Sequence, residues 1–242
     1  MHPSRVVAGA FAVALLSGCG PKLGPKTHQY LADACGAIRQ LDADLAREPA
    51  PKAPAPPDLG ALKTREAQAA ALQDFSDKLT KFYAETQQGT GRVMALCDQA
   101  LEKYGKLDGE DTDPQAPDLV ARYKVLINGR QQMAVNIEAL ISQQRSALRK
   151  GFVPRYALRL LGAAVDAMYS PSERLPDGVS PAADELKPEP SEKSEATGQN
   201  LGTQRAIASW RQNVADAAAA RADLLTALTA KYGDTDWSIL QP

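Results

Sequence analysis

Apolar side chains recur at steps of three and four residues along most of this chain, which is the spacing of an α-helix. The pattern predicts five helices, over residues 28–47, 58–104, 117–151, 154–169 and 203–232. We find no sustained apolar–polar alternation of the kind that marks a half-buried strand. The sequence therefore predicts an all-α protein: an elongated helical bundle with coiled-coil-like long helices, in a single helical domain over residues 27–242.

The second and longest region contains an interruption. From Leu72 to Tyr104 its apolar positions step by about 3.5 residues on average, which is the coiled-coil period. Gly89 and Gly91 lie in the middle of this stretch. Each glycine costs about 1 kcal/mol relative to alanine in a helix interior. The pair predicts either a kink or a break into two helices.

The third region carries polar residues inside its apolar seam. Arg130 and Gln144 occupy positions that the helical spacing assigns to the buried face, among residues such as Leu126 and Ile137. Buried polar side chains in coiled coils hold neighbouring helices in one register. We expect these two residues to play that part here.

Two proline-rich stretches separate the helices. Residues 48–57 hold five prolines, which favour a semi-rigid polyproline II spacer; a ligand for an aromatic groove is the alternative. Residues 171–202 hold five more among charged and hydroxylic residues, with too little apolar surface to offset the entropy of ordering, which predicts a disordered loop. The apolar tail of Trp237, Ile239 and Leu240 is expected to fold back on the bundle.

The tripeptide Lys-Tyr-Gly ends both the second and the fifth region, at Gly105 and Gly233, and an Asp-Thr-Asp follows each copy. A tandem duplication would produce such an echo. Convergent helix capping is the favoured interpretation, because glycine commonly follows a helix end and lysine suits its last turn.

The N-terminus combines a positive residue, an apolar run and a cysteine. Arg5 precedes an apolar run over residues 6–16, which is too short to span a bilayer and has the length of a secretory signal core. The sequence Leu16-Ser17-Gly18-Cys19 follows and resembles the lipobox of bacterial lipoproteins; an ordinary signal peptide with a chance cysteine is the alternative. The resemblance implies a signal peptide over residues 1–18, cleavage before Cys19 and lipidation of its thiol and amino group.

Residues 19–26 then form a lipidated tether that anchors the protein in a membrane. Gly20, in place of an aspartate after the cysteine, favours the outer membrane by resemblance to the sorting pattern of enteric lipoproteins, with the protein facing the periplasm.

Charge gives no reason to expect a nucleic-acid partner. The chain has 28 Lys+Arg and 29 Asp+Glu, and loss of Arg5 with the signal leaves 27 against 29, a net charge of −2. The envelope location instead favours a protein partner.

The sequence offers no recognisable catalytic, cofactor or metal site, so we expect a protein that is not an enzyme and binds no cofactor. His28 is the one histidine after the signal, and no phosphate-binding loop, dinucleotide fingerprint or nucleophile elbow occurs. The acidic clusters 108–113 and 234–236 lack the EF-hand pattern, so solvated loops are favoured over calcium sites. Carboxylate-only glycosidase chemistry stays open, because it needs just two acids in a cleft.

Secretion would place the two remaining cysteines, Cys35 and Cys97, in an oxidising compartment. We predict a disulfide between them. The lengths of the two helices allow it only with a long crossover or a bent second helix, because bonded cysteines need Cα atoms within about 7 Å. Two separate buried thiols are the alternative.

These features predict a lipid-anchored helical scaffold or partner-binding protein of the bacterial cell envelope. A helical-bundle carrier of small ligands is the alternative, and an envelope enzyme is third. An oversized apolar cavity would favour the carrier, and an exposed apolar stripe would favour the scaffold.

Overall fold

The structure is a computed structural model that describes residues 23–107, 116–150, 152–172, 186–233 and 236–241. These residues form an all-α protein, as predicted, and none of them lies in a strand. The helices are α1 (Pro25–Ala46), η1 (Leu59–Ala61), α2 (Arg65–Gly105), α3 (Ala116–Arg149), α4 (Arg155–Tyr169), η3 (Pro190–Glu195), α5 (Gly198–Tyr232) and η4 (Ser238–Leu240). Among the described residues, no helix is long and apolar enough to cross a membrane.

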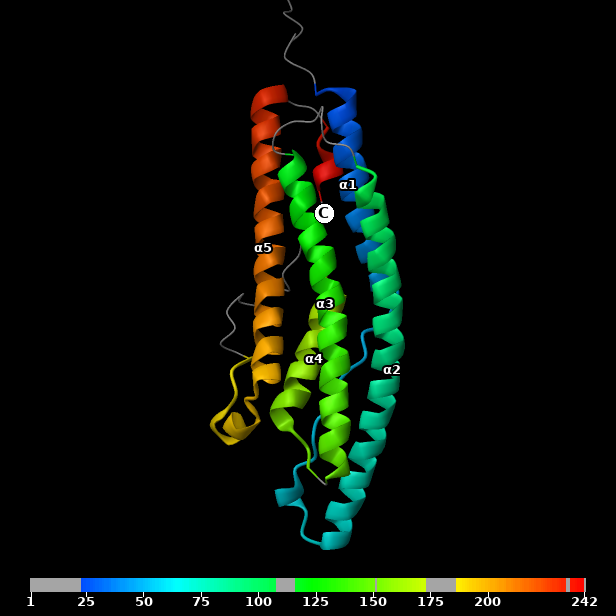
Figure 1. Cartoon of the computed structure of the whole chain (residues 1–242), viewed down its shortest axis with the longest axis vertical. Helices are drawn as coiled ribbons and strands as arrows, with labels where there is room; N and C mark the ends of the chain where they lie inside the picture. Colours follow the sequence, from blue (N-terminus) through cyan, green and yellow to red (C-terminus); the bar gives the residue numbers. More distant parts are fainter. Residues whose placement is uncertain (1–22, 108–115, 151, 173–185, 234–235, 242) are drawn as a thin grey trace, which may run out of the picture.

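Three long helices run side by side along an elongated bundle, and two shorter ones share the remaining position (Figure 1). α2, α3 and α5 have 41, 34 and 35 residues, whereas α1 has 22 and α4 has 15. α1 lies beside one half of the long helices and α4 beside the other half (Figure 1). At about 1.5 Å per residue, α2 alone spans roughly 61 Å.

α1 and α4 meet at their C-terminal ends. Asp42, one turn before the end of α1, accepts hydrogen bonds from the backbone and the hydroxyl of Ser172, at 3.0 and 2.9 Å. Ser172 follows Ser170, the C-cap of α4. The segment after α1 runs on past α4, where Ala53 packs against Gly162, before α2 starts at the far end of the bundle (Figure 1).

Helix caps explain where α2 begins. Asp58, at the start of the predicted region, caps only the short η1, where its side chain accepts a hydrogen bond from Gly60 N. Thr64 caps α2 by accepting from Ala67 N. The predicted helical region therefore starts seven residues too early, because the one-turn η1 and a second cap lie between Asp58 and Arg65.

Of the two outcomes predicted for the glycine pair, a kink or a break, the structure excludes the break, because α2 is continuous from Arg65 to Gly105. A β-carbon at Gly89 would collide with the Tyr169 hydroxyl of α4, whereas nothing lies within 4 Å of one at Gly91. Gly89 therefore makes room for α4. The cost of two glycines is offset by the packing of a long helix on its neighbours.

The predicted disordered loop over 171–202 is also wrong in its second half. Residues 186–202 include η3 and the start of α5, which begins at Gly198 rather than at Thr203. Glu195 is the reason this segment is ordered: its carboxylate accepts from the backbone N–H groups of Arg155 and Tyr156 in the first turn of α4, at 3.1 and 2.9 Å. Residues 173–185 lie outside the described part of the chain.

The two Lys-Tyr-Gly sequences end their helices differently. Gly233 follows α5 with a φ of 70°, a conformation that favours glycine. Gly105 is still helical, and Lys106 in the right-handed region ends α2. The tail after α5 packs as expected: Arg39 of α1 donates to the carbonyls of Ile239 and Gln241, both at 3.1 Å.

Candidate functional site

The structure contradicts the predicted disulfide, because Cys35 and Cys97 are both buried thiols that are not joined to each other. The long crossover between α1 and α2 that a disulfide requires is present, but the alignment of the two helices does not bring Cys35 beside Cys97. Tyr104 Oη donates to the carbonyl of Ala34 at 2.7 Å, which places Cys97 opposite a position near Leu41. Cys35 lies about six residues from there, or roughly 9 Å along the axis, beyond the reach of a disulfide.

The other sequence-predicted sites are either outside the described residues or exposed. Cys19 and the acidic cluster 108–113 lie outside them, and so do residues 234 and 235. His28 is exposed on the first turn of α1. Asp236 accepts a hydrogen bond from Ser238 N at 2.9 Å, and this bond holds the pKa of the carboxyl below its ordinary value. The described residues contain no group of three potential metal ligands.

Arg130 and Gln144 are buried in the bundle, as the sequence predicts for the seam of the third helix. Gln144 donates to the carbonyl of Pro154 at 3.2 Å. Arg130 donates to Asp42 of α1 at 2.8 Å and to the carbonyl of Ser170, and its guanidinium lies 5.3 Å from the ring centre of Trp210 in α5. One side chain of α3 thus contacts α1, α5 and the C-cap residue of α4.

The surroundings of Arg130 explain how a fully buried cation is tolerated. It lies where the C-terminal ends of α1 and α4 meet, and the backbone dipoles place partial negative charge at both ends. Asp42 supplies a full negative charge. The Nε and Nη1 atoms of Arg130 have no hydrogen-bond partner among the described residues. Because the guanidinium of Arg130 is fully buried, it does not contact solvent or a ligand. Its role is therefore structural, at the junction of α1 and α4.

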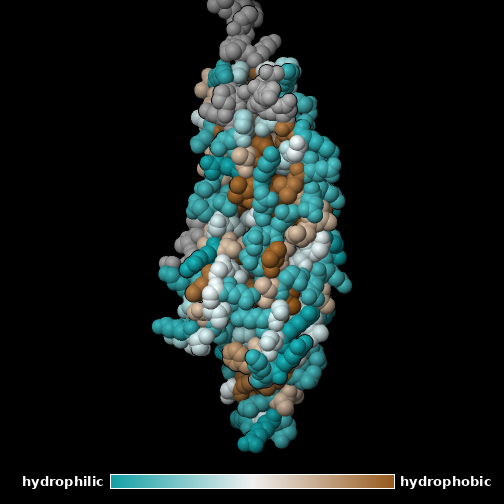
Figure 2. Space-filling view, in the orientation of Figure 1, coloured by the Kyte–Doolittle hydropathy of each residue, from teal (hydrophilic) through white to brown (hydrophobic). Residues whose placement is uncertain are grey.

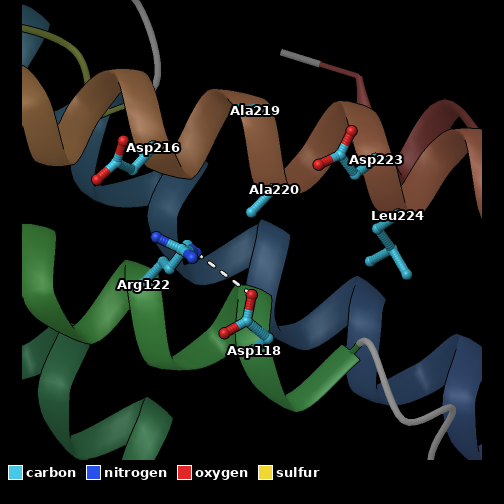
Figure 3. A pocket seen from close by; sticks show the side chains of 7 residues that line it. All are labelled: Asp118, Arg122, Asp216, Ala219, Ala220, Asp223 and Leu224. Atoms are coloured by element: carbon cyan, nitrogen blue, oxygen red, sulfur yellow. Dashed lines mark hydrogen bonds and ion pairs between the residues drawn. The ribbon is translucent and has the colours of Figure 1, made fainter.

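An open groove between α3 and α5 provides the candidate site (Figure 3). It has a volume of about 530 Å³. α3 contributes Asp118 and Arg122, and α5 contributes Asp216 and Asp223 (Figure 3). The remaining wall is short or apolar: Ala219, Ala220 and Leu224. Its α3 residues belong to the first turns of that helix, which lie near the end of the bundle where α1 begins (Figure 1).

The groove carries an excess of negative charge. Arg122 Nε donates to Asp118 Oδ2 at 3.3 Å, so these two lining charges offset each other. The carboxylate of Asp216 accepts a hydrogen bond from the side-chain amide of Gln212 at 2.8 Å, and Gln212 carries no charge. Asp223 lies two turns farther along α5 and is exposed. Two carboxylates therefore face the groove without a cation from the lining to neutralise them.

Sequence reasoning missed this groove. Asp216 and Asp223 are seven residues apart, so they lie on one face of a helix. That spacing signals a shared face, but it does not say which helix packs beside it. Asp118 is far away in sequence and joins the site only through the antiparallel packing of α3 on α5.

Comparison with known proteins adds no relative: no protein-family model, no curated protein and no solved structure matches this chain.

Proposed function

We propose that this protein is a lipid-anchored helical scaffold of the bacterial cell envelope, which binds a partner protein through a basic segment seated in the groove between α3 and α5. The observation that carries the proposal is the groove itself. Asp216 and Asp223 offer carboxylates without a lining cation, and the alanines between them leave room for long lysine or arginine side chains. Opposite charges across an interface favour encounter and fix its register.

The surface favours a charged contact over an apolar one. On the face in Figure 2, hydrophobic residues form small groups separated by hydrophilic ones, without a continuous stripe. The exposed large apolar residues among the described ones are Leu72, Val125, Val135 and Phe152, which are distributed along the chain. A partner held by charge would dissociate as salt screens the interaction.

A carrier of small apolar ligands is supported less well. Such a carrier needs a cavity lined mainly by apolar and aromatic side chains. The groove between α3 and α5 is open and carries four charged side chains. The lipid anchor in the proposal rests on the residues around Cys19.

The test neutralises the groove and compares it with a matched surface change. Asp216→Asn with Asp223→Asn removes the two carboxylates, and Asp74→Asn with Asp77→Asn makes the same charge change on the exposed face of α2. Affinity capture from envelopes, followed by identification of the bound proteins, should recover a partner with the wild type and the α2 variant. The groove variant should lose it.

A peptide made from the basic contact segment of that partner should then bind the purified protein. We expect at least tenfold weaker binding to the groove variant and a steep decrease with salt. Equal binding of both variants, or a partner that contacts the protein without basic residues, would contradict the proposal.

A further inference from the structure

Two further hollows lie toward the opposite end of α3, around its last turns. One, of about 310 Å³, opens toward α2 and is lined by Gln87, Glu138, Arg145 and Arg149, among others. The other, of about 550 Å³, opens toward α5 and is lined by residues that include Lys150, Phe152 and Gln199. Both hollows are lined by Ser142 and Ser146, so they lie on the two sides of one ridge of α3.

The hollow toward α2 is rich in cations that have no acidic partner. Within the described part of the chain, no carboxylate forms an ion pair with Arg145 or Arg149 of this hollow, nor with Lys150 of the other one. Arg145 is held by neutral groups: it donates to Gln87 Oε1 at 3.3 Å and lies 5.6 Å from the ring centre of Tyr83. Its positive charge is therefore oriented but not neutralised.

Arginine side chains are suited to carboxylates. The planar guanidinium presents parallel N–H groups that match the two oxygens of a carboxylate. Arg145 and Arg149 are four residues apart and so lie on the same face of α3. Glu138 in the same hollow accepts from Thr90 Oγ1 at 3.0 Å, and its carboxylate can also accept from a ligand hydroxyl.

The hollow toward α5 offers the other contacts that a sugar uses. Phe152 lies at the edge of this hollow and is 52% exposed, so its ring provides a flat apolar surface for the C–H face of a sugar ring. Gln143 lines the same hollow, and its buried Oε1 has no hydrogen-bond partner among the described residues. A buried acceptor of this kind gains from a donor on a ligand.

We propose that the two hollows form one binding site for a carboxylated oligosaccharide that crosses the ridge of α3 at Ser142 and Ser146. The carboxylate binds Arg145 and Arg149, the hydroxyls bind the serines and amides, and a neighbouring ring packs on Phe152. The short serine side chains let the ligand pass from one hollow to the other. This site is independent of the α3–α5 groove, because the nearest α3 residues that line the two, Arg122 and Glu138, are 16 residues apart, or roughly 24 Å along the helix.

The test measures binding of defined saccharides to the full-length chain by calorimetry. Trigalacturonate, with three carboxylated rings, should bind, and the uncharged galactotriose should bind at least tenfold more weakly. Arg145→Gln with Arg149→Gln should weaken trigalacturonate binding at least tenfold. Lys103→Gln with Lys106→Gln removes the same charge at the C-terminal end of α2, away from the hollows, and should leave trigalacturonate binding unchanged.

Hexaglutamate separates sugar recognition from general attraction to acids. Phe152→Ala should weaken trigalacturonate binding several-fold and leave any hexaglutamate binding unaltered. The proposal is overturned if trigalacturonate does not bind, if galactotriose binds as well, or if hexaglutamate binds as tightly as trigalacturonate. Asp216→Asn with Asp223→Asn should not affect trigalacturonate binding, so failure of the partner groove and failure of this site remain distinguishable.

Discussion

At the scale of single residues, Gly89 and Cys97 show how packing against neighbouring helices sets the properties of a position. The hydroxyl of Tyr169 occupies the place that a β-carbon at Gly89 would take. Cys97 is fully buried, and this burial raises the pKa of its thiol to about 11 in spite of the opposing effect of Arg130. The sequence drew attention to both positions for other reasons, an interrupted helix at Gly89 and a disulfide at Cys97.

Gly89→Ala should destabilise the protein by about 1 to 3 kcal/mol, because the added methyl group must displace Tyr169. Gly91→Ala, two residues away in open space, should stabilise it by up to about 1 kcal/mol through helix propensity. Urea denaturation measures both. Tyr169→Phe in the Gly89→Ala background should restore part of the loss. Equal effects of the two glycine changes would argue against a collision at Gly89.

The raised pKa of Cys97 should make stability fall in alkaline solution. The thiol titrates near 9.0 when unperturbed and at about 11 in the folded protein, so the folded state holds the proton more tightly. This stabilisation is complete below pH 9 and is lost as the pH rises toward 11. We expect a loss of about 1 kcal/mol between pH 8 and 10 that Cys97→Ala removes. An unchanged pH dependence in that variant would assign the loss to other groups.

At the scale of helices, the bundle is held where α1 and α4 meet. Because α1 and α4 share one of the four helical positions, both end inside the molecule. The backbone carbonyls of a last helical turn have no partner within their own helix and need one from elsewhere. Arg130 from α3 binds one of those carbonyls, at Ser170, and Asp42 binds the backbone of Ser172. The polar seam that the sequence shows in the third helix therefore serves this junction.

Asp42→Ala should cost about 3 kcal/mol or more, because it leaves Arg130 buried without its counter-ion. Asp44→Ala is the matched control: its ion-pair partner Arg47 is 75% exposed, so the pair should be worth less than about 1 kcal/mol. Chemical denaturation compares them. Replacing both partners, with Asp42→Leu and Arg130→Met, should be less harmful than Asp42→Ala alone. A double variant less stable than Asp42→Ala would mean that the ion pair contributes more to the free energy of unfolding than the burial of its two charges costs.

At the scale of the whole molecule, the bundle separates two candidate binding regions. The acidic groove lies near the end where α1 begins, and the basic hollows lie toward the opposite end of α3 (Figure 1). If Cys19 carries lipid, the acidic groove is close to the membrane and the basic hollows face away from it. The long helices then act as a spacer of fixed length.

Cys19→Ser tests the anchor. The variant should not incorporate labelled fatty acid and should leave the membrane fraction, because the acyl chains that hold the protein are absent. Cys35→Ser should retain both the label and the membrane location. Fractionation with fatty-acid labelling measures this. Membrane partitioning of Cys19→Ser equal to that of the wild type would refute lipidation at this residue.

The sequence by itself determined which segments are helical, because the spacing of apolar side chains and the capping residues are local properties. It located α1, α3 and α4 to within about three residues and placed Arg130 and Gln144 in the buried seam. It misjudged the start of α5, because Glu195 orders that segment by reaching the N-terminus of a different helix.

Tertiary structure decided every feature that depends on how one helix is aligned with another. The register of α1 on α2 keeps Cys35 and Cys97 apart, and Tyr169 accounts for Gly89. The antiparallel packing of α3 on α5 brings Asp118 to Asp216 and Asp223. Helical periodicity specifies which face of a helix is buried, but many alignments bury the same faces. Only the packing of particular side chains selects one of them.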